Sequence, residues 1–319
     1  MKQISVSERL TASVRALGSV GHRWLEDLPG VVAGLEAEWS ITAGAPLGGG
    51  HAAYVAEAVT LSGQPVVLKV GLPPGIEGFA PFEQELTTLR LAEGDPYVKL
   101  LRHDAARRSL LLERLGDPLA NLGWSTMKQL TAAVSTVARG WRPVLNQPLP
   151  TGKGKARWLA DFVSSAWKDL RQPCAEAAAA RAVGYVAERV AGLEGDRGVL
   201  VHGDAHSLNL LKMPGSPDDS GSFRLVDPEG LVSEPAHDLG VILRAWNEEL
   251  LRGDTAAMAF RRCQHVTQLT GVNPEAIWQW SYVERLSTGL FLFSLGHRQE
   301  ARSYLAVADR LAEVVPPWA

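Results

Sequence analysis

The segment LVHGDAHSLNLLK, at residues 200–212, constrains the fold of this chain more than any other. After a hairpin-sized interval it is followed by FRLVDPEG at residues 223–230. Within these segments Asp204 precedes Asn209 by five residues, and Asp227 comes directly after an apolar run. This pattern predicts a polar loop between short strands and a chain reversal that brings the second aspartate back toward the loop.

Short apolar runs predict three strands, at residues 199–201, 210–212 and 223–226. The last two flank MPGSPDDSGS, which is rich in the Pro, Gly, Ser and Asp residues that form turns. If these two strands form a hairpin, Asp227 returns beside Asn209. Two oxygen ligands then converge on one position suited to magnesium.

Asp204, Asn209 and Asp227 together are typical of a phosphoryl-transfer site. Such a site needs one carboxylate at the attacking hydroxyl, and a carbonyl oxygen and a second carboxylate for the metal ions that bridge the nucleotide phosphates. The loop pattern alone could arise by chance, and an aspartate before Pro228 could simply start a turn. Because all three residue types occur at the required places, we favour phosphoryl transfer.

The composition sets the broad class. The chain has 319 residues, 46% hydrophobic and 21% charged, which predicts a fully folded protein of two lobes. Cys174 and Cys263 are the only cysteines, so we expect neither a disulfide framework nor a structural zinc site. The first residues lack the pattern of a targeting segment, and no apolar run reaches the length of a membrane span.

These observations favour a cytoplasmic protein without a membrane partner. A formal charge of −3 and a pI near 6.3 provide no basic stripe, so nucleic acid is not expected as a partner. The sequence also indicates no obligate protein partner. A small molecule that carries a hydroxyl group is the partner that a phosphoryl-transfer site implies.

The first part of the chain predicts a nucleotide-covering sheet. Residues 5–39 read as two helices, which form an N-terminal helical arm, and residues 41–70 read as strands around a Gly-rich turn. Gly48, Gly49 and Gly50 in that turn would let backbone N–H groups lie close over phosphates. A glycine triplet is also common in plain flexible hairpins, so this assignment depends on the lysine that follows.

Lys69 ends an apolar strand, where a kinase places the lysine that contacts the α- and β-phosphates. A glutamate of the next helix holds that lysine. FAPFEQELTTLRLAEG supplies two candidates, Glu83 and Glu85, on different helical faces. We favour Glu85 because it aligns with the apolar stripe of the helix, and Glu83 is the alternative.

A strongly apolar strand at residues 110–112 leads to a hinge near residues 113–116. In a two-lobed kinase the exposed main chain of the hinge hydrogen-bonds the nucleotide base. By the order of elements alone, this assigns the base contact to Glu113 and Leu115. From residue 121 onward Ala-rich segments predict a mainly helical lobe.

The order of these parts resembles the aminoglycoside phosphotransferase family, and most closely its streptomycin 6-phosphotransferase and hydroxyurea kinase branch. The segments that carry the resemblance include GGGHAAYVA, VVLKVGLP, LLLERLG and HGDAHSLNLL, and the stretch from His202 to Trp246 is the most specific. The resemblance implies an α+β, protein-kinase-like two-lobed fold. Residues 1–115 would form a small lobe with the helical arm and an antiparallel sheet. Residues 116–319 would form a mainly helical lobe with the catalytic loop and the acceptor pocket.

The resemblance also implies transfer of the γ-phosphoryl group of ATP, with GTP left open, to a small-molecule hydroxyl in the presence of Mg²⁺. Asp204 would be the catalytic aspartate, Asn209 and Asp227 the magnesium ligands, and Lys69 the phosphate-binding lysine. In this family the EPAHDLG segment supports the catalytic loop, so Asp238 is expected to be structural.

The chain departs from protein kinases in ways that disfavour a protein substrate. Position 203 is Gly rather than the Arg that pairs with a phosphorylated activation loop, Pro228 replaces the Phe of DFG, and there is no room for a switchable activation loop. Glu229 adds a carboxylate beside Asp227. Its role, as a metal contact or as a solvent-facing turn residue, stays open, whereas His202 and His206 are expected to brace the loop.

The acceptor is the least determined part. Aminoglycosides are polycations that require acidic or aromatic linings, and residues 236–319 are expected to form much of the pocket. Arginines there nearly balance the acidic residues. The candidate acceptor contacts are Trp246, Glu248, Glu249 and Glu284. Streptomycin, another aminocyclitol, hydroxyurea and an unrelated sugar or alcohol all remain open as acceptors.

Two other functions compete with a kinase. A hydrolytic metal centre could use the acidic and imidazole side chains of this region, namely His202, Asp204, His206, Asp227, His237 and Asp238. That alternative leaves the Gly-rich turn, Lys69 and Glu85 without a role. A silent nucleotide-binding protein is disfavoured because every expected catalytic residue type is present.

Overall fold

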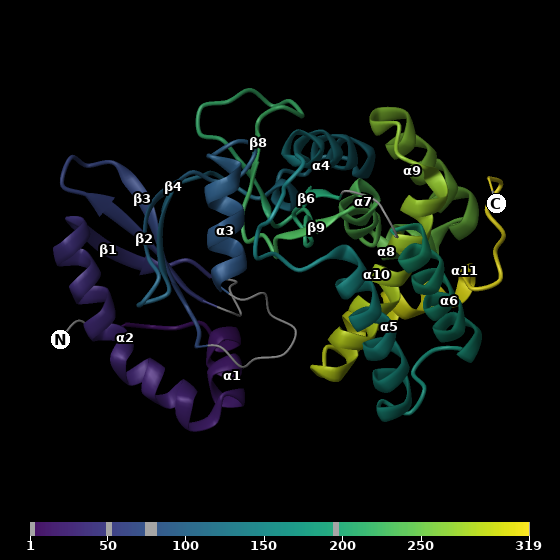
Figure 1. The fold of residues 1–319 in the computed structure, drawn as a ribbon, viewed down its shortest axis with the longest axis horizontal. Coiled ribbons are helices and arrows are strands. Elements are labelled where there is room, and N and C mark those ends of the chain that lie inside the picture. The colour runs from purple at the N-terminus through teal and green to yellow at the C-terminus, as the bar shows by residue number, and fades with distance from the viewer. Residues whose placement is uncertain (1–3, 49–52, 74–81, 194–197, 319) are drawn as a thin grey trace. The chain divides into compact units, whose positions relative to one another are not determined.

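The computed structural model describes residues 4–48, 53–73, 82–193 and 198–318. Contacts divide the chain into two compact units, Met1–Gly116 and Asp117–Ala319. Figure 1 shows that the long strands belong to the first unit and most of the helices to the second. No helix among the described residues is both long and apolar enough to span a bilayer.

A five-stranded sheet forms the body of the first unit, in the order β1-β2-β3-β5-β4 with every neighbouring pair antiparallel. Its strands are β1 Ile41–Pro46, β2 Ala53–Thr60, β3 Pro65–Gly71, β4 Leu100–Asp104 and β5 Ser109–Glu113. The central strand β3 is buried from Val66 onward. Its VVLKV run explains this position, because a central strand covered on both faces is nearly continuously apolar.

The two helices of the predicted N-terminal arm precede this sheet. The N-terminal arm consists of α1 Glu8–Ala16 and α2 Gly18–Trp39, and α2 runs unbroken through Pro29. Its buried stripe of Leu28, Val32 and Leu35 joins the core formed by the inner faces of β1, β2 and β3. The third helix, α3 Phe82–Ala92, carries the two candidate glutamates in its first turn.

The second unit is mainly helical. It contains α4 Thr126–Gly140, α5 Gly152–Asp169, α6 Glu176–Gly192, α7 Pro235–Leu243, α8 Asn247–Arg252, α9 Thr255–Thr270, α10 Pro274–Ser294, α11 Arg298–Leu311 and a 3-10 turn, Leu119–Asn121. Helix α10 is its centre and packs against α5, α6, α7, α9 and α11. Trp280 and Tyr282 of α10 are almost fully buried.

Helix α7 approaches α10 closely because Gly240 has no side chain. A Cβ at this position would lie only 2.5 Å from the Cβ of Trp280. The glycine of EPAHDLG is therefore a packing requirement. It fixes the N-terminal turn of α7, which carries Asp238, against the core of the second unit.

Two small antiparallel sheets frame the loop at residues 202–209. Strand β6 Val199–Val201 pairs with β9 Leu231–Ser233, and β7 Leu210–Lys212 pairs with β8 Phe223–Leu225. The β7–β8 hairpin is the one that the sequence predicts. Strand β6 is also predicted, but its pairing with β9 is not, because the sequence analysis assigns no strand to residues 231–233.

Candidate active site

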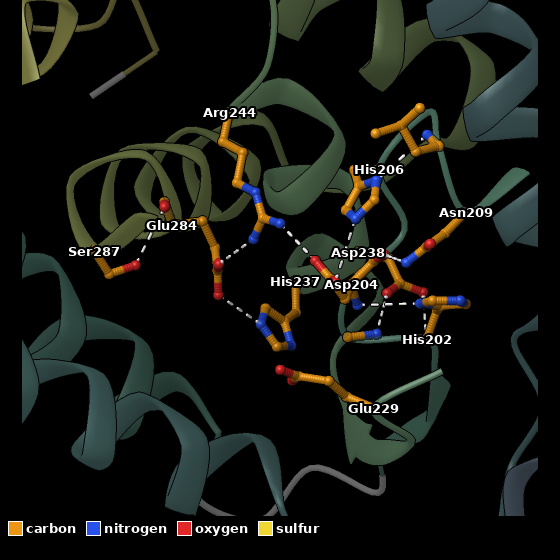
Figure 2. Close-up of polar contacts among 12 residues, drawn as sticks. His202, Asp204, His206, Asn209, Glu229, His237, Asp238, Arg244, Glu284 and Ser287 are labelled. Atoms are coloured by element: carbon orange, nitrogen blue, oxygen red, sulfur yellow. Dashed lines mark hydrogen bonds and ion pairs between the residues drawn. The ribbon is translucent and has the colours of Figure 1, made fainter. Parts of the chain in front are cut away.

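Helix α7 fixes the start of the catalytic loop, residues 202–209, through one buried carboxylate. Asp238 is 1% exposed. Its Oδ2 accepts the N–H of His202 at 3.0 Å, and its Oδ1 accepts the N–H of Gly203 at 2.9 Å. Its Oδ2 also accepts the indole N–H of Trp141 at 3.0 Å. Figure 2 shows Asp238 beside the loop. The expected structural role of Asp238 is thus visible as three hydrogen bonds.

The ring of His202 braces the loop from inside. Its Nδ1 accepts the N–H of Asp204 at 3.1 Å, so Nε2 carries the proton and donates to the carbonyl of Val226 at 2.9 Å. Burial lowers the pKa of this fully buried imidazole, although nearby carboxylates oppose the shift. A neutral ring with its proton on Nε2 therefore ties the loop to the end of β8.

Gly203 is required by its backbone and by its surroundings. Its φ is +83°, a left-handed value that side chains disfavour, and a Cβ would lie 2.5 Å from Leu231 Cδ2 and 3.0 Å from Glu229 Cβ. The tight approach of the 229–231 segment leaves no room for the arginine found here in protein kinases. The glycine of the HGD sequence is therefore required by the close packing of residues 229–231 against the loop.

Asp204 is the predicted catalytic carboxylate, and it lies on this braced loop. Its side chain is 32% exposed, Oδ1 accepts from Arg244 Nη2 at 2.5 Å, and Oδ2 lies 3.5 Å from His206 Nε2. Burial alone would raise the pKa of Asp204, but His206 and Arg244 outweigh that effect and hold the pKa well below its usual range. Asp204 is therefore an ionised hydrogen-bond acceptor near neutral pH.

The backbone brings Asn209 next to Asp204 and next to the residue before Asp227. The Nδ2 of Asn209 donates to the carbonyl of Asp204 at 3.0 Å, which leaves Oδ1 as the atom suited to a cation. The N–H of Val226 donates to the carbonyl of Asn209 at 2.9 Å, so Asp227 follows directly after this pairing, with a φ of +55°. Carboxylate and amide oxygens are donors that Mg²⁺ prefers, so the pair fits this ion.

A hydrolytic metal centre finds no support in the geometry. Within the described parts of the chain no three or more His, Cys, Asp or Glu side chains converge in a way that could hold a metal ion. All six residues considered for such a centre are among the described ones. His202 and Asp238, in particular, are committed to bracing the loop.

A buried charge network behind Asp204 is not apparent from the sequence. Arg244, at the C-cap of α7, donates from Nη1 to Glu284 Oε2 at 2.9 Å, and His237 Nε2 lies 3.0 Å from Glu284 Oε1. Glu284 is 3% exposed. Burial raises the pKa of Glu284, but its bond to His237 and the charge of Arg244 lower it to about 2. An arginine at a helix end usually faces solvent, so the sequence offers no signal for this link.

Glu229, whose role the sequence leaves open, is held by a lysine of α5. Lys155 Nζ lies 2.9 and 3.0 Å from the two carboxylate oxygens of Glu229. Attraction to Glu229 and to Glu284 raises the pKa of Lys155 even though burial opposes it. Helix α5 therefore contributes a cation beside the catalytic loop, which the sequence analysis does not find.

In the first unit Lys69 and Glu85 form a buried pair. Lys69 Nζ lies 2.6 and 2.7 Å from the two oxygens of Glu85, and the residues are 9% and 8% exposed. Glu83 instead pairs with Arg108 at 2.7 Å. Of the two glutamates that the sequence offers, Glu85 is thus the one that holds the lysine.

The structure describes only some of the other residues that are predicted to contact the nucleotide. Gly48 has open space where a Cβ would lie, whereas Gly49 and Gly50 fall outside the described residues. The N–H of Glu113 donates to the carbonyl of Lys99 at 3.1 Å, and its carboxylate accepts the N–H of Lys99 at 2.7 Å. Leu115 is 4% exposed.

The four candidate acceptor contacts differ in accessibility. Glu248 is exposed, and Trp246 is partly exposed with a left-handed φ of +55°. The guanidinium of Arg262 lies 6.0 Å from the centre of the Trp246 ring and also pairs with Glu249 at 2.8 Å. Both carboxylate oxygens of Glu284 are already bonded within the protein.

This combination of a lysine–glutamate pair on an antiparallel sheet with an HGDxHxxN loop and a DPEG segment defines a protein-kinase-like phosphotransferase. The choline kinase LicA from Streptococcus pneumoniae shares the fold, with a TM-score of 0.57, 16% sequence identity, and coverage of 86% of this chain and 97% of that one. The expected fold class is therefore confirmed.

The chain belongs to the aminoglycoside/hydroxyurea antibiotic resistance kinase family, whose profile matches residues 38–291. Streptomycin 6-kinase from Streptomyces glaucescens is 28% identical over 296 residues, which cover 91% of either chain. Hydroxyurea phosphotransferase from Kitasatospora aureofaciens is 27% identical over 287 residues, which cover 86% of this chain and 76% of that protein. The predicted family and the predicted enzyme class, a small-molecule phosphotransferase, are thus confirmed.

Proposed function

We propose that this enzyme transfers the γ-phosphoryl group of ATP to a hydroxyl of an aminoglycoside or aminocyclitol, with streptomycin as the first candidate. The observation that carries the proposal is the Asp204 carboxylate, which pairs with Arg244 and is presented by a loop that α7 braces. The similarity to streptomycin 6-kinase over nearly the whole chain supports this acceptor class. The hydroxyurea phosphotransferase relative makes hydroxyurea the second candidate.

Asp204 has the geometry of the residue that receives the acceptor hydroxyl. Arg244 hydrogen-bonds Oδ1, whereas Oδ2 has His206 Nε2 at the longer distance of 3.5 Å. Oδ2 is therefore the oxygen proposed to accept the hydroxyl hydrogen as the new O–P bond forms. Asn209 and Asp227 would hold magnesium, which supplies countercharge to the nucleotide phosphates when bound. Because the transition state is loose, the protein contributes mainly placement and charge.

We assign the nucleotide to the region of Lys69. Its ammonium, oriented by both oxygens of Glu85, is suited to the α- and β-phosphates, and the glycines of residues 48–50 would donate backbone N–H groups. The main chain of Glu113 and Leu115 remains the proposed contact for the base. Residues 1–115 and 116–319 are the proposed nucleotide-covering and acceptor-binding lobes, and ATP is the proposed donor ahead of GTP.

The acceptor side is proposed from accessibility. Glu248 and Trp246 are open enough to contact a cationic sugar, and Glu249 would do so by sharing its carboxylate with Arg262. Direct contact with Glu284 would require breaking a bond to Arg244 or His237. We therefore propose a supporting role for Glu284. A cytoplasmic site of action follows from the use of ATP.

A panel of acceptors tests the proposal. Purified enzyme is incubated with Mg²⁺ and either ATP or GTP, together with streptomycin, a second aminocyclitol, hydroxyurea or a simple amino sugar. The mass of the product reports the added phosphoryl group. We expect streptomycin to be modified on its inositol-like ring with ATP. Modification of amino sugars alone would contradict the aminoglycoside proposal, and modification of hydroxyurea alone would support the second candidate.

A further inference from the structure

Arg244 lies between the reactive carboxylate and a carboxylate buried in the core. Its Nη2 donates to Asp204 Oδ1 at 2.5 Å, and its Nη1 donates to Glu284 Oε2 at 2.9 Å. The Arg244 side chain is only 13% exposed. Figure 2 shows the continuous series of contacts that runs from His237 through Glu284 and Arg244 to the catalytic loop.

The two ends of this series differ in burial and in the kind of element that carries them. Glu284 belongs to the central helix α10 and is held at its other oxygen by the fully buried His237, whereas Asp204 belongs to a loop and is 32% exposed. A guanidinium presents its N–H groups in a fixed planar fork, so anchoring one nitrogen also orients the other. Helix α10 thereby determines, through Glu284 and Arg244, where Oδ1 of Asp204 lies.

We propose that Arg244 is a positioning residue for phosphoryl transfer, which holds Asp204 by Oδ1 so that Oδ2 is aimed at the acceptor hydroxyl, and that Glu284 orients Arg244 for this task. This inference rests on the proposed function, because it assigns the acceptor hydroxyl to Asp204. In the step itself the hydroxyl oxygen forms a bond to the γ-phosphorus. The bond from that phosphorus to the β-γ bridging oxygen breaks, ADP leaves with the electron pair, and the hydroxyl proton passes to Oδ2.

Other charged groups near Asp204 do not replace this contact. The groups that act on its carboxylate come from its own loop and from three helices, namely His202, His206, Arg244 of α7, Lys155 of α5 and Tyr304 of α11. Lys155 is committed to Glu229, and His202 hydrogen-bonds the backbone on both sides of its ring. His206 lies at the other carboxylate oxygen. Loss of Arg244 therefore removes the only described side chain that hydrogen-bonds Oδ1.

Three substitutions separate positioning from simple structural support. Arg244→Met removes both the fork and the charge, Arg244→Lys keeps the charge without the fork, and Glu284→Gln weakens the anchor of the guanidinium. Arg261→Met is the control, because Arg261 is exposed on α9. Each variant is assayed for kcat, KM and the pH dependence of kcat, using the acceptor found in the panel. The titration of the Asp204 carboxyl carbon is followed by carbon-13 NMR, with Asp204→Asn for assignment.

For Arg244→Met we expect kcat to fall about 100-fold with little change in KM, because a catalytic group displaced by about 1 Å loses this much. The acid limb of its kcat profile and the titration of Asp204 should both move to higher pH. Arg244→Lys should restore the titration but only part of kcat, and Glu284→Gln should lose less than Arg244→Met. Arg261→Met should match the wild type.

Wild-type kcat in Arg244→Met, or a lower kcat with an unmoved acid limb and Asp204 titration, would overturn the inference. If Arg244→Met does not fold, as judged by circular dichroism, the kcat, its pH profile and the Asp204 titration of Arg244→Lys and Glu284→Gln are compared with the wild type instead. The NMR titration needs no acceptor. If the wild type phosphorylates no member of the panel, the proposed function fails, whereas an unmoved Asp204 titration in the Arg244 variants refutes the contact itself.

Discussion

Asp238 Oδ1 accepts the backbone N–H of Gly203 at 2.9 Å, and this contact joins helix α7 to the catalytic loop one residue before Asp204. The same carboxylate also accepts the N–H of His202 and the indole N–H of Trp141. The loop thus depends on a buried group that never needs to touch a substrate. Its geometry is set by α7, and that of α7 is set by the close approach of Gly240 to α10.

Replacement of Asp238 by alanine should therefore affect both stability and catalysis. Three donors would lose their acceptor, so we expect a loss of about 2–4 kcal/mol in the free energy of unfolding, since an unsatisfied buried donor costs about 1–3 kcal/mol. Turnover should fall more steeply than substrate affinity. Urea unfolding and steady-state kinetics provide the measurements, with exposed Asp161→Ala of α5 as the control. An active, stable Asp238→Ala enzyme would refute the bracing role.

Gly203→Ala and Gly184→Ala should change stability in opposite directions. At Gly203 the left-handed backbone costs about 1–2 kcal/mol for a side chain, and the clash with Leu231 adds to it. Gly184 lies on the exposed side of α6 with nothing within 4 Å of a Cβ, so alanine should stabilise by about 0.5–1 kcal/mol. Thermal unfolding of the two variants measures the contrast. Equal effects at both glycines would contradict the assigned packing.

The two glutamates of α3 provide a matched pair for the lysine site. Glu85→Gln removes the carboxylate that holds Lys69, and a lost charge-assisted hydrogen bond of about 1.5–3 kcal/mol corresponds to a fall of about 10- to 100-fold in kcat/KM for ATP. Glu83→Gln breaks only an exposed contact with Arg108 and should stay near wild type. Kinetics at varied ATP concentration distinguish them. A larger loss in Glu83→Gln would reverse the assignment.

Glu284 should make stability depend on pH in the acid range. Its pKa in the folded protein, about 2, lies below its ordinary value of 4.5, so the ionised form stabilises the fold above about pH 5. This contribution, up to about 3 kcal/mol, is lost as the pH falls toward 2. Urea unfolding from pH 6 to pH 2 should therefore show a steeper loss for the wild type than for Glu284→Gln. Parallel curves would mean that Glu284 has no depressed pKa.

Much of this architecture is readable from the sequence because the chemistry depends on local spacing. The β7–β8 hairpin follows from two apolar runs around a turn-rich segment. In its register the N–H of Val226 hydrogen-bonds the carbonyl of Asn209, so Asp227 comes one residue after this contact. The choice of Glu85 over Glu83 follows from helical periodicity, because only one of two residues two apart can share the face that carries the apolar stripe.

The network behind Asp204 is not readable in this way, because its members come from separate helices. Arg244 reaches Glu284 across 40 residues, and Lys155 reaches Glu229 across 74. No periodicity within one helix encodes such a contact. The sequence counts Glu284 among the acceptor contacts because acidic residues are expected there, but the packing of α7 on α10 gives it a buried partner instead.

Turnover by Asp204→Asn tests the central claim most directly. The substitution preserves size and the loop's hydrogen-bonding backbone but removes the acceptor for the hydroxyl proton, a function that contributes about 10²- to 10⁴-fold to the rate. With the acceptor identified by the panel, we predict a loss of kcat in this range, with unchanged ATP affinity and circular dichroism. An Asp204→Asn enzyme that turns over at the wild-type rate would contradict the account.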